Sequence, residues 1–247
     1  MKTIFTRPES MTDKPIIYCS GCGHGVAHRI IAEIIDELGV REKTIAVAPV
    51  GCSVFAYDYW NFDVTEAPHG RTPCVATGIK RVLPDRLVFS YQGDGDLASI
   101  GMGEIIHTAN RGENITVVFI NNANYGMTGG QMAPTTVFGQ KTTTTPAGRT
   151  RQEGHPIRIP ELLASLEGAV YLDRQSLHDP AHILKAKKSL KKAFEAQRAG
   201  KGFSLVELLS ICPSNWGLSP KDSIPWLRDN LIPVFPLGVV KDITEKR

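Results

Sequence analysis

A glycine-rich turn, GDGD, places two acidic residues directly after an apolar run. Gly93 and Gly95 would allow the backbone to approach a phosphate group closely. The amides of Asp96 and Leu97, which lead into a predicted helix, would then donate hydrogen bonds to the phosphate oxygens. A bare Asp94 carboxylate would repel that phosphate, whereas Mg2+ would bridge the carboxylate and the phosphate oxygens. Taken alone, Gly-Asp-Gly often marks no more than a tight turn.

A second polar segment, NNANYGMTGG, follows the next predicted strand. Neighbouring parallel strands end at the same edge of a sheet, so Asp94 and Asn122 are expected to lie side by side there. We predict that Mg2+ is bound by Asp94, by the Asn122 side chain and by the main-chain carbonyl of Asn124. Asp96 is expected to serve chiefly as a helix cap. The two segments together resemble the thiamine-diphosphate signature, in which Gly-Asp-Gly is followed by Asn-Asn; turn chemistry on an unrelated sheet is the alternative.

Four cysteines form a second candidate site. Cys19 and Cys22 stand three positions apart in YCSGCGHG. Cys52 and Cys212 each follow a predicted strand, so they are expected at the same edge of the sheet. The doublet alone fits zinc, an iron-sulfur cluster or a redox dithiol. Because zinc sites built from two pairs usually contain two close doublets and this sequence has one, a [4Fe-4S] cluster bound by the four thiolates is favoured.

Two further residues near these motifs have less definite roles. Cys74 lies at the start of a predicted helix and is expected to be a small core residue. His24 follows the cysteine doublet and is expected either to donate a hydrogen bond to a sulfur or to the cofactor, or to face solvent. Disulfides are the weaker explanation for an odd number of cysteines in a chain without an export signal.

The elements that must position these residues alternate along the chain. β-branched apolar runs predict strands, and apolar residues at helical spacing predict helices. The predicted strands are residues 44–53, 86–95, 114–122 and 202–212, and the predicted helices are residues 26–38, 98–111 and 179–198. This alternation predicts an α/β fold with a parallel sheet flanked by helices. The length suits a single domain spanning residues 1–247.

Composition disfavours several classes of function. The chain is 42% apolar and 21% charged, as expected for a globular domain, and its net charge is +3. The basic residues gather at residues 185–198 as the expected wet face of one helix, so we predict no nucleic-acid partner. No apolar run approaches the length of a membrane span and no signal peptide is evident. We therefore predict no membrane partner and a cytoplasmic location.

Two segments interrupt the alternating pattern. Residues 123–160 are rich in Gly, Thr and Pro and directly follow a chemical motif, so a functional loop or lid is expected there. Residues 219–242 contain four prolines with scattered apolar residues. This segment is expected to be either an extended C-terminal arm that lies across another surface or a tail packed on its own domain.

Six motifs occur in a specific order over nearly the whole chain: CSGCGHG, PVGCSVFAYDY, HGRTPCVATGIK, GDGDLASIG, NNANYGMTGGQMAPTT and CPSNWG. Together they resemble the β subunit of the 2-oxoacid:ferredoxin oxidoreductases. The resemblance implies the diphosphate-binding half of a thiamine-diphosphate-binding fold and one [4Fe-4S] cluster held by Cys19, Cys22, Cys52 and Cys212. It also implies an α subunit with the pyrimidine-binding half of the site and its activating glutamate, γ and δ subunits in some assemblies, and ferredoxin as electron acceptor.

The family's activity is the oxidative decarboxylation of a 2-oxoacid with coenzyme A as co-substrate. Acyl-CoA and CO2 are the products, and the electrons leave through the cluster. By the same resemblance, Met127, Thr128 and His69 are expected at the catalytic end of the cofactor, with Thr128 as a phosphate donor. The residues expected to contact the cofactor or the subunit boundary are Gly51, Cys52, Ser53, His69, Arg71, Gly93, Asp94, Gly95, Asp96, Leu97, Asn122, Asn124, Tyr125, Gly126, Met127 and Thr128.

The substrate is suggested by the residues near the motif loops. A substrate with a second carboxylate would require a fixed Arg or Lys, whereas Phe55, Met127 and Gly129 are apolar or small. A branched or aromatic 2-oxoacid such as 2-oxoisovalerate is therefore predicted, with a 2-oxoglutarate-specific enzyme as the alternative. Two different classes of protein also fit part of the pattern: a non-redox thiamine-dependent lyase or ligase, which needs no cluster, and a zinc-stapled binding module without chemistry.

Overall fold

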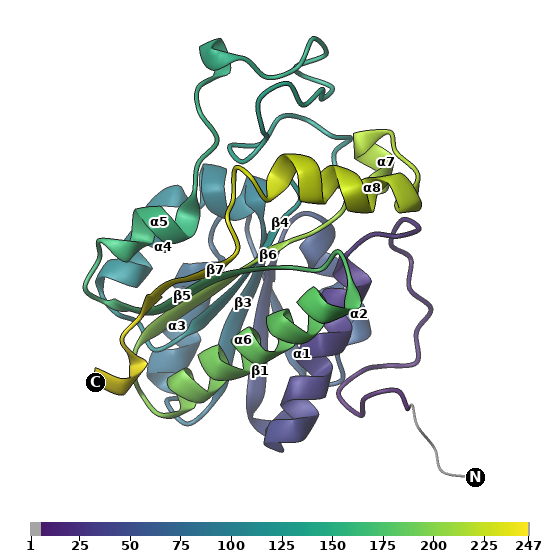
Figure 1. Ribbon diagram of the computed structural model, residues 1–247. Helices are drawn as coiled ribbons and strands as arrows, with labels where there is room; N and C mark the ends of the chain where they lie inside the picture. The colour runs from purple at the N-terminus through teal and green to yellow at the C-terminus, as the bar shows by residue number, and fades with distance from the viewer. Residues whose placement is uncertain (1–5, 247) are drawn as a thin grey trace.

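Seven strands form one sheet in the computed structural model, which describes residues 6–246 (Figure 1). Their order is β2-β1-β3-β4-β6-β5-β7. The strands are β1 (Thr44–Pro49), β2 (Asp63–Ala67), β3 (Leu87–Gly93), β4 (Thr116–Asn121), β5 (Ala169–Ser176), β6 (Phe203–Leu209) and β7 (Gly238–Asp242). Pairs among β1 to β6 are parallel, and β7 pairs antiparallel with β5. The predicted parallel α/β sheet is confirmed.

Helices cover both faces of the sheet. α1 and α6 pack together on one face, whereas α3 and α4 lie on the other face and α5 contacts β5 and β7 (Figure 1). The helices are α1 (His24–Leu38), α2 (Ala56–Tyr59), α3 (Thr72–Val82), α4 (Met102–Asn110), α5 (Ile159–Ala164), α6 (Pro180–Arg198), α7 (Pro213–Trp216) and α8 (Pro220–Trp226). Among residues 6–246, no helix combines the length and the apolar character needed to cross a membrane.

The central strands are apolar on both sides. Phe89 and Tyr91 of β3 belong to the core under α1 and α6, whereas Val88 belongs to the core under α3 and α4. Successive side chains of a strand point to opposite faces of the sheet. A parallel strand that is covered on both faces is therefore apolar along its length, which is why the sequence indicates β1, β3, β4 and β6 clearly.

The strands that lead to the site end earlier than the sequence predicts. β1 ends at Pro49 and not at residue 53, because the backbone turns at Gly51, whose φ is 117°. Cys52 then begins a 3-10 turn, Cys52–Phe55. β6 ends at Leu209 and not at residue 212, so Cys212 stands at the start of α7. Both cysteines lie in the segments just beyond the strands.

The register of the parallel strands gathers their ends at one edge of the sheet. Gly93 pairs with Ile120, and Asn121 pairs with Leu209. The segments that follow β3, β4 and β6 therefore leave the sheet at the same level. This is the edge at which ligands bind in open α/β sheets.

The helix predicted at residues 98–111 is divided in two. Asp96–Ile100 forms a π-helical turn, and α4 begins after Gly101. A Cβ atom on Gly101 would lie 2.8 Å from the Asp96 carbonyl oxygen and 3.0 Å from the Gly70 carbonyl oxygen. The absence of a side chain there allows the segment before α3 to approach the start of α4.

Three strands have weak sequence signals. β2 is largely exposed, and β7 is a partly exposed edge strand. β5 contains Asp173 and Arg174, which are charged but buried. β2 and β7 are short and mix apolar with charged residues, and the apolar run at residues 169–172 of β5 ends at two charged residues, so the pattern that predicts strands is weak in each.

Residues 123–160 form the long segment that extends beyond the carboxyl edge of the sheet (Figure 1). Arg149, 4% exposed, organises this segment. Its guanidinium donates hydrogen bonds to six main-chain carbonyl groups: those of Ala133, Pro134, Thr136, Glu153, Gly154 and His155. This one buried guanidinium thus supplies the hydrogen-bond donors that these carbonyl groups would find in a strand or a helix.

The C-terminal segment packs on its own domain instead of forming an extended arm. α8 continues into a π-helical turn, Leu227–Leu231, and β7 then joins the sheet. Leu227, Leu231 and Phe235 are buried against Ala123 and Val137. The tail therefore supports the segment that follows β4.

A buried ion-pair network connects β4, β5, β6 and α5. Arg174, which is fully buried, donates from Nε to Glu207 at 2.6 Å and from Nη1 and Nη2 to the two oxygens of Glu161. Glu207, also fully buried, accepts from Asn121 Nδ2 at 2.7 Å. Asn121 Oδ1 in turn accepts from the amide of Ala123. The network therefore fixes the end of β4, immediately before the predicted magnesium ligands.

We expect the Arg174→Met variant to lose about 3–5 kcal/mol of unfolding free energy, because it leaves the Glu207 carboxylate buried without its cation. Urea denaturation followed by circular dichroism measures the loss. The double variant Arg174→Met, Glu207→Gln should recover much of it, since the introduced glutamine can still accept from Asn121 and carries no charge. A loss under about 1 kcal/mol in the single variant would contradict the expectation.

Candidate active site

A cavity opens at the carboxyl edge of the sheet, between the segments that follow β1, β3 and β4. Its lining includes every residue predicted to contact the cofactor except Arg71 and Leu97. The lining residues are His24, Val50, Gly51, Cys52, Ser53, His69, Gly93, Asp94, Gly95, Asp96, Asn122, Asn124, Tyr125, Gly126, Met127 and Thr128. Segments that are far apart in the sequence thus form one cavity.

Asp94 is a buried carboxylate at the base of this cavity, with 2% of its surface exposed. Oδ1 accepts from the Gly95 amide at 2.9 Å, and Oδ2 accepts from the Asn124 amide at 3.1 Å and from Thr135 Oγ1 at 2.6 Å. Burial nevertheless raises the pKa of Asp94 to about 7, because the three donors compensate for the lost hydration only in part. The carboxylate therefore favours an added cation or a proton.

Asn122 carries an acceptor without a partner. Its side-chain Oδ1 is buried and accepts no hydrogen bond, whereas its main-chain oxygen accepts from Asn124 Nδ2 at 2.8 Å and from Trp216 Nε1 at 3.0 Å. An unsatisfied buried oxygen costs about 1–3 kcal/mol. Because Asn122 lines the cavity beside Asp94, this oxygen is available to a ligand.

The backbone between these two asparagines is strained. Ala123 has a φ of 57°, which is uncommon for a residue with a side chain. Its carbonyl oxygen accepts from Thr136 Oγ1 at 2.7 Å and from Gln140 Nε2 at 3.0 Å, so residues of the long segment hold this conformation. Such strain concentrates at ligand sites, and here it sets the positions of Asn122 and Asn124.

Asp96 does not cap a helix, contrary to the sequence prediction. Its Oδ1 accepts from the Gly70 amide at 2.5 Å and lies 2.6 Å from His69 Nδ1, and its Oδ2 accepts from Gln92 Nε2 at 2.6 Å. The interaction with Asp96 raises the pKa of His69. Asp96 therefore holds the segment before α3 against the wall of the cavity.

The four thiols predicted to bind a cluster lie close to one another. Burial is the main cause of a raised pKa, to about 12 for Cys22 and about 11 for Cys52, and the neighbouring thiols add to the effect. The pKa of Cys212 is also raised by burial. Cys19 is exposed. Thiolates at these positions would repel one another, so a metal centre between them would favour their ionised form.

The spacing of the sulfurs is wider than a single zinc ion requires. Among residues 6–246, no three cysteines have all their sulfur atoms within 4.8 Å of one another. Zinc with Zn–S bonds of about 2.3 Å would hold its sulfurs about 3.8 Å apart.

Close backbone packing brings the cysteine doublet to this edge. A Cβ atom on Gly23 would lie 2.1 Å from Ser210 Oγ, and the Gly23 amide donates to the Ile211 carbonyl at 3.3 Å. The turn that contains Cys22 thus lies directly beside the segment that leads to Cys212.

His24 is buried at the start of α1 and lines the cavity, so the solvent-facing alternative is wrong. Its Nδ1 lies 2.6 Å from Tyr91 Oη, and its ring stacks on Tyr18 with the centroids 4.9 Å apart. Burial lowers the pKa of His24 to about 4, so the imidazole is neutral near pH 7. Its side chain bonds to Tyr91 and not to a sulfur.

The side chains of four predicted residues are placed as follows; Thr128 is the one of these that lines the cavity. The Arg71 side chain is 45% exposed and forms an ion pair with Glu104. The Leu97 side chain is fully buried in the core under α3 and α4. Cys74 is exposed, so the prediction of a core residue is wrong. Thr128 donates from Oγ1 to Gln131 at 2.6 Å within its own loop.

Two residues that the sequence did not indicate contribute to the site. Thr135 donates to Asp94; it lies within NNANYGMTGGQMAPTT, but the motif does not indicate this role. Asn215 donates from Nδ2 to the Gly126 carbonyl at 2.8 Å and lies 3.5 Å from Cys212 Sγ, so it connects the cysteine segment to the cavity loop. Its position in CPSNWG was the available signal.

Gly95 allows the ring of Tyr125 to close over the turn after β3. An added Cβ would lie 2.3 Å from Tyr125 Cε1. We expect Gly95→Ala to cost about 1–3 kcal/mol of unfolding free energy, because the ring must be displaced. The matched control is Gly103→Ala in α4, where no atom lies within 4 Å of the new Cβ; it should be neutral or stabilising by up to about 1 kcal/mol. Equal thermal denaturation midpoints for the two variants would contradict the expectation.

The fold and the site together define a thiamine-diphosphate-binding domain. Residues 49–208 match the family model of the thiamine pyrophosphate enzyme, C-terminal TPP binding domain. The matched region begins at the end of β1 and includes Asp94, Asn122 and the segment between β4 and β5.

Comparison with curated relatives and with a solved structure identifies the family within this class of proteins. The chain is 46% identical over 240 residues to the ketoisovalerate oxidoreductase subunit VorA of Methanothermobacter thermautotrophicus, covering 97% of this chain and 50% of the relative. It is 38% identical over 238 residues to the 2-oxoglutarate synthase subunit KorB of Methanocaldococcus jannaschii, covering 94% and 83%. The solved structure is the 2-oxoglutarate:ferredoxin oxidoreductase from Magnetococcus marinus with 2-oxoglutarate, coenzyme A and succinyl-CoA bound; the TM-score is 0.79 at 30% identity, covering 92% of this chain and 74% of that chain.

The chain belongs to the family of thiamine-diphosphate-binding β subunits of the 2-oxoacid:ferredoxin oxidoreductases. The resemblance drawn from the sequence motifs is thereby confirmed. The chain spans about half the length of the VorA relatives that it matches.

Proposed function

We propose that the cavity binds thiamine diphosphate through Mg2+, and that the chain is one subunit of an enzyme that oxidatively decarboxylates a 2-oxoacid. The observation that carries this proposal is the partnerless Oδ1 of Asn122 beside the buried Asp94 carboxylate. Carboxylate and amide oxygens are the ligands that Mg2+ prefers. Asp94, Asn122 and the carbonyl of Asn124 would hold the ion, and thiamine diphosphate supplies the electron sink for decarboxylation.

The chain's own residues would bind and orient the diphosphate. A Cβ atom on Gly93 would have Ser53 Oγ, 3.9 Å away, as its nearest neighbour, so this glycine leaves space toward the cavity. The amides that begin the helical turn after Gly95 supply donors for phosphate oxygens. Asp96 would keep His69 at the cavity wall, with the imidazole able to carry a proton because its pKa is raised.

The four thiols Cys19, Cys22, Cys52 and Cys212 would hold a [4Fe-4S] cluster. The thiols are near enough to affect one another's ionisation, which supports their placement around one centre. Cys52 also lines the cavity, so electrons removed from the substrate would travel a short distance to the cluster and then to ferredoxin.

A partner α subunit would complete the site, with γ and δ subunits in the larger assemblies. Two apolar side chains that line the cavity remain substantially exposed: Val50 at 47% and Met127 at 44%. Exposed apolar residues around a cavity are typical of an interaction surface. The partner would cover them and supply the pyrimidine-binding half of the site, so the isolated chain should be catalytically incomplete.

We propose 2-oxoisovalerate, or another branched or aromatic 2-oxoacid, as the substrate, with coenzyme A as co-substrate. Among the described residues, no Arg or Lys lines the cavity, so this subunit offers no fixed cation to a second substrate carboxylate. The relative at 46% identity is a ketoisovalerate oxidoreductase subunit, which supports the same substrate class.

The test uses the chain co-purified anaerobically with its partner subunits. Oxidation of 2-oxoisovalerate, 2-oxoglutarate and pyruvate is measured with coenzyme A and a viologen acceptor. We expect the highest kcat/KM for 2-oxoisovalerate and no turnover without coenzyme A. A preference for 2-oxoglutarate would overturn the substrate, and turnover that needs no electron acceptor would overturn the oxidative reaction.

A further inference from the structure

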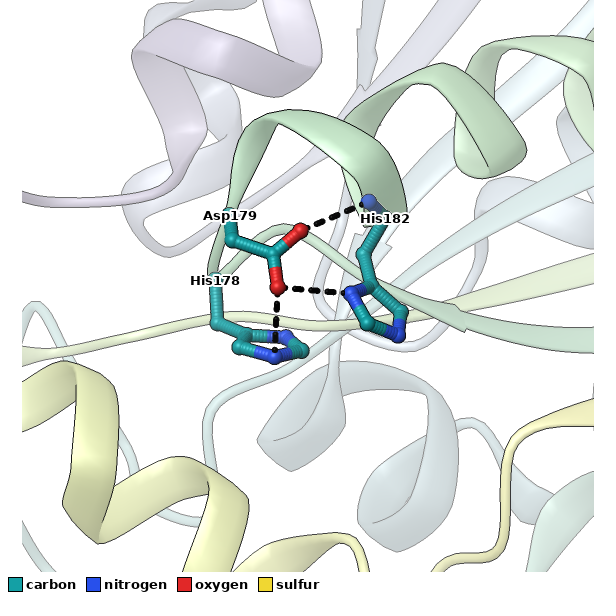
Figure 2. A group of neighbouring side chains, drawn as sticks. All are labelled: His178, Asp179 and His182. Carbon is teal, nitrogen blue, oxygen red and sulfur yellow. Dashed lines mark hydrogen bonds and ion pairs between the residues drawn. The ribbon is translucent and has the colours of Figure 1, made fainter.

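Two histidines and an aspartate lie close together between the end of β5 and the first turn of α6. None of the three lines the cavity. Figure 2 shows the Asp179 carboxylate between the imidazole rings of His178 and His182. Asp179 Oδ2 lies 3.1 Å from His178 Nε2 and 2.8 Å from His182 Nδ1. The three ligand atoms all lie within 4.8 Å of one another.

The local fold holds these side chains in place. Asp179 is the N-cap of α6, and its Oδ1 accepts from the His182 amide at 2.8 Å. Pro180 then occupies the first turn, where its fixed φ favours the helix. Helix capping uses Oδ1 of Asp179 and leaves Oδ2 facing the two imidazole rings. Capping therefore does not explain why Oδ2 lies between His178 and His182.

The hydrogen-bond partner on the far side of His178 allows the tautomer that a metal ligand needs. His178 Nδ1 lies 2.8 Å from Ser176 Oγ, and that hydroxyl has the Leu209 carbonyl as an acceptor at 3.5 Å. If the hydroxyl proton is directed to the carbonyl, Nδ1 carries the proton and Nε2 presents a lone pair to Asp179 Oδ2. Two electron-rich atoms then face each other, and a cation between them would remove their repulsion. An imidazole whose second nitrogen donates to an oxygen is the usual arrangement of a metal-ligating histidine.

We propose that His178 Nε2, Asp179 Oδ2 and His182 Nδ1 form a binding site for a divalent transition metal ion of the zinc class. Two imidazole nitrogens and one carboxylate oxygen are a common ligand set for Zn2+ with an open position. With bonds of about 2.0 Å, neighbouring ligands of a tetrahedral ion stand about 3.3 Å apart, so small side-chain rotations suffice. The side chains of His182 and Asp179 are 26% and 38% exposed, which leaves access for a water ligand.

Two positively charged groups would disfavour a bound cation, and the effect of each is small. The N-terminus of α6 contributes about 0.3–1 kcal/mol of unfavourable interaction at an exposed site. Arg228 faces His178 from the tail, but its guanidinium is 60% exposed and pairs with Asp229 at 2.8 Å. The Asp179 charge offsets both. The bound ion would fix the junction between β5 and the first turn of α6.

The test is isothermal titration of the purified full chain with Zn2+, comparing wild type with Asp179→Asn and with the double variant His178→Gln, His182→Gln. Asparagine caps a helix as well as aspartate does, so Asp179→Asn keeps the start of α6. The exposed His107→Gln in α4 is the matched control. Zinc bound by the thiols is common to all four proteins, so this site appears as a difference between them.

We expect wild type and His107→Gln to bind one more equivalent of Zn2+ than the double variant, and Asp179→Asn to bind that equivalent at least ~10-fold more weakly. Ser176→Ala should weaken it by about 10–100-fold without removing a ligand. Co2+ at this site should give d–d absorption bands that the double variant lacks. Equal Zn2+ stoichiometry and affinity in wild type and the double variant, with unchanged circular dichroism, would overturn the proposal.

Discussion

We expect the Asp94→Asn variant, assembled with its partner subunits, to bind thiamine diphosphate with Mg2+ at least ~100-fold more weakly than wild type, equivalent to about 2.7 kcal/mol. The physical reason is the loss of the negative charge of the Asp94 carboxylate, because a neutral amide oxygen attracts a hard divalent cation less strongly than a carboxylate does. Activity at a fixed, low cofactor concentration should fall in parallel. Cofactor titration by fluorescence quenching or calorimetry measures the change.

Asp85→Asn is the control for this variant, because Asp85 is exposed in the turn before β3, at the opposite end of the sheet. It should bind the cofactor as wild type does. If Asp94→Asn retained wild-type affinity while Mg2+ was still required, the ion would have other ligands, and our assignment of Asp94 would be wrong.

The same carboxylate should make cofactor binding depend on pH. Burial raises the pKa of Asp94 to about 7, so a proton competes with Mg2+ below that pH. Affinity should rise roughly tenfold per unit as the pH approaches 7 and level off above it. Because the folded pKa exceeds the unfolded value, the stability that Asp94 contributes to the metal-free protein is lost as the pH rises from about 4 through about 7. The difference between wild type and Asp94→Asn in urea denaturation at pH 6 and pH 8 isolates this contribution.

Cys212→Ser should abolish the proposed iron-sulfur cluster. A serine hydroxyl binds iron only weakly. Because Cys212 is the most buried of the four thiols, water cannot take the place of the missing sulfur ligand either. We expect iron and acid-labile sulfide to fall to background, the visible absorbance of the anaerobically purified protein to disappear, and viologen reduction to fall at least ~100-fold. Cys22→Ser should behave in the same way, since Cys22 interacts with the other three thiols of the group.

Cys74→Ser is the matched control, because Cys74 is exposed on α3, away from the four clustered thiols. It should keep its iron, colour and activity. A non-redox thiamine-dependent lyase or ligase would keep its activity in Cys212→Ser, and a zinc module would show no colour in wild type. Either result would contradict the cluster assignment.

The sequence alone was enough to predict most of the residues that line the cavity. Asp94 and Asn122 follow apolar strand runs, and these runs are strong signals because parallel strands buried on both faces are apolar throughout. Parallel strands end at one edge, so two motifs after two neighbouring strands must meet there. The same reasoning placed Cys52 and Cys212 near the cavity, although it extended their strands to residues 53 and 212, whereas β1 ends at Pro49 and β6 at Leu209.

Which groups lack partners and which are held in place depends on how the chain packs. No strand is predicted at residues 169–176, because Asp173 and Arg174 interrupt the apolar pattern, and a charge that is buried by pairing cannot be distinguished in sequence from one that is exposed. Thr135 and Asn215 lie within motifs, but their partners are distant in sequence, so their roles are visible only in the folded chain. Arg149 belongs to no motif, and its role depends on how the segment folds around it. The partnerless Oδ1 of Asn122 likewise depends on what every other donor reaches in three dimensions. Residue types and strand order fix where chemistry can occur, whereas burial and hydrogen-bond competition, which are properties of the packed chain, fix the state of each group.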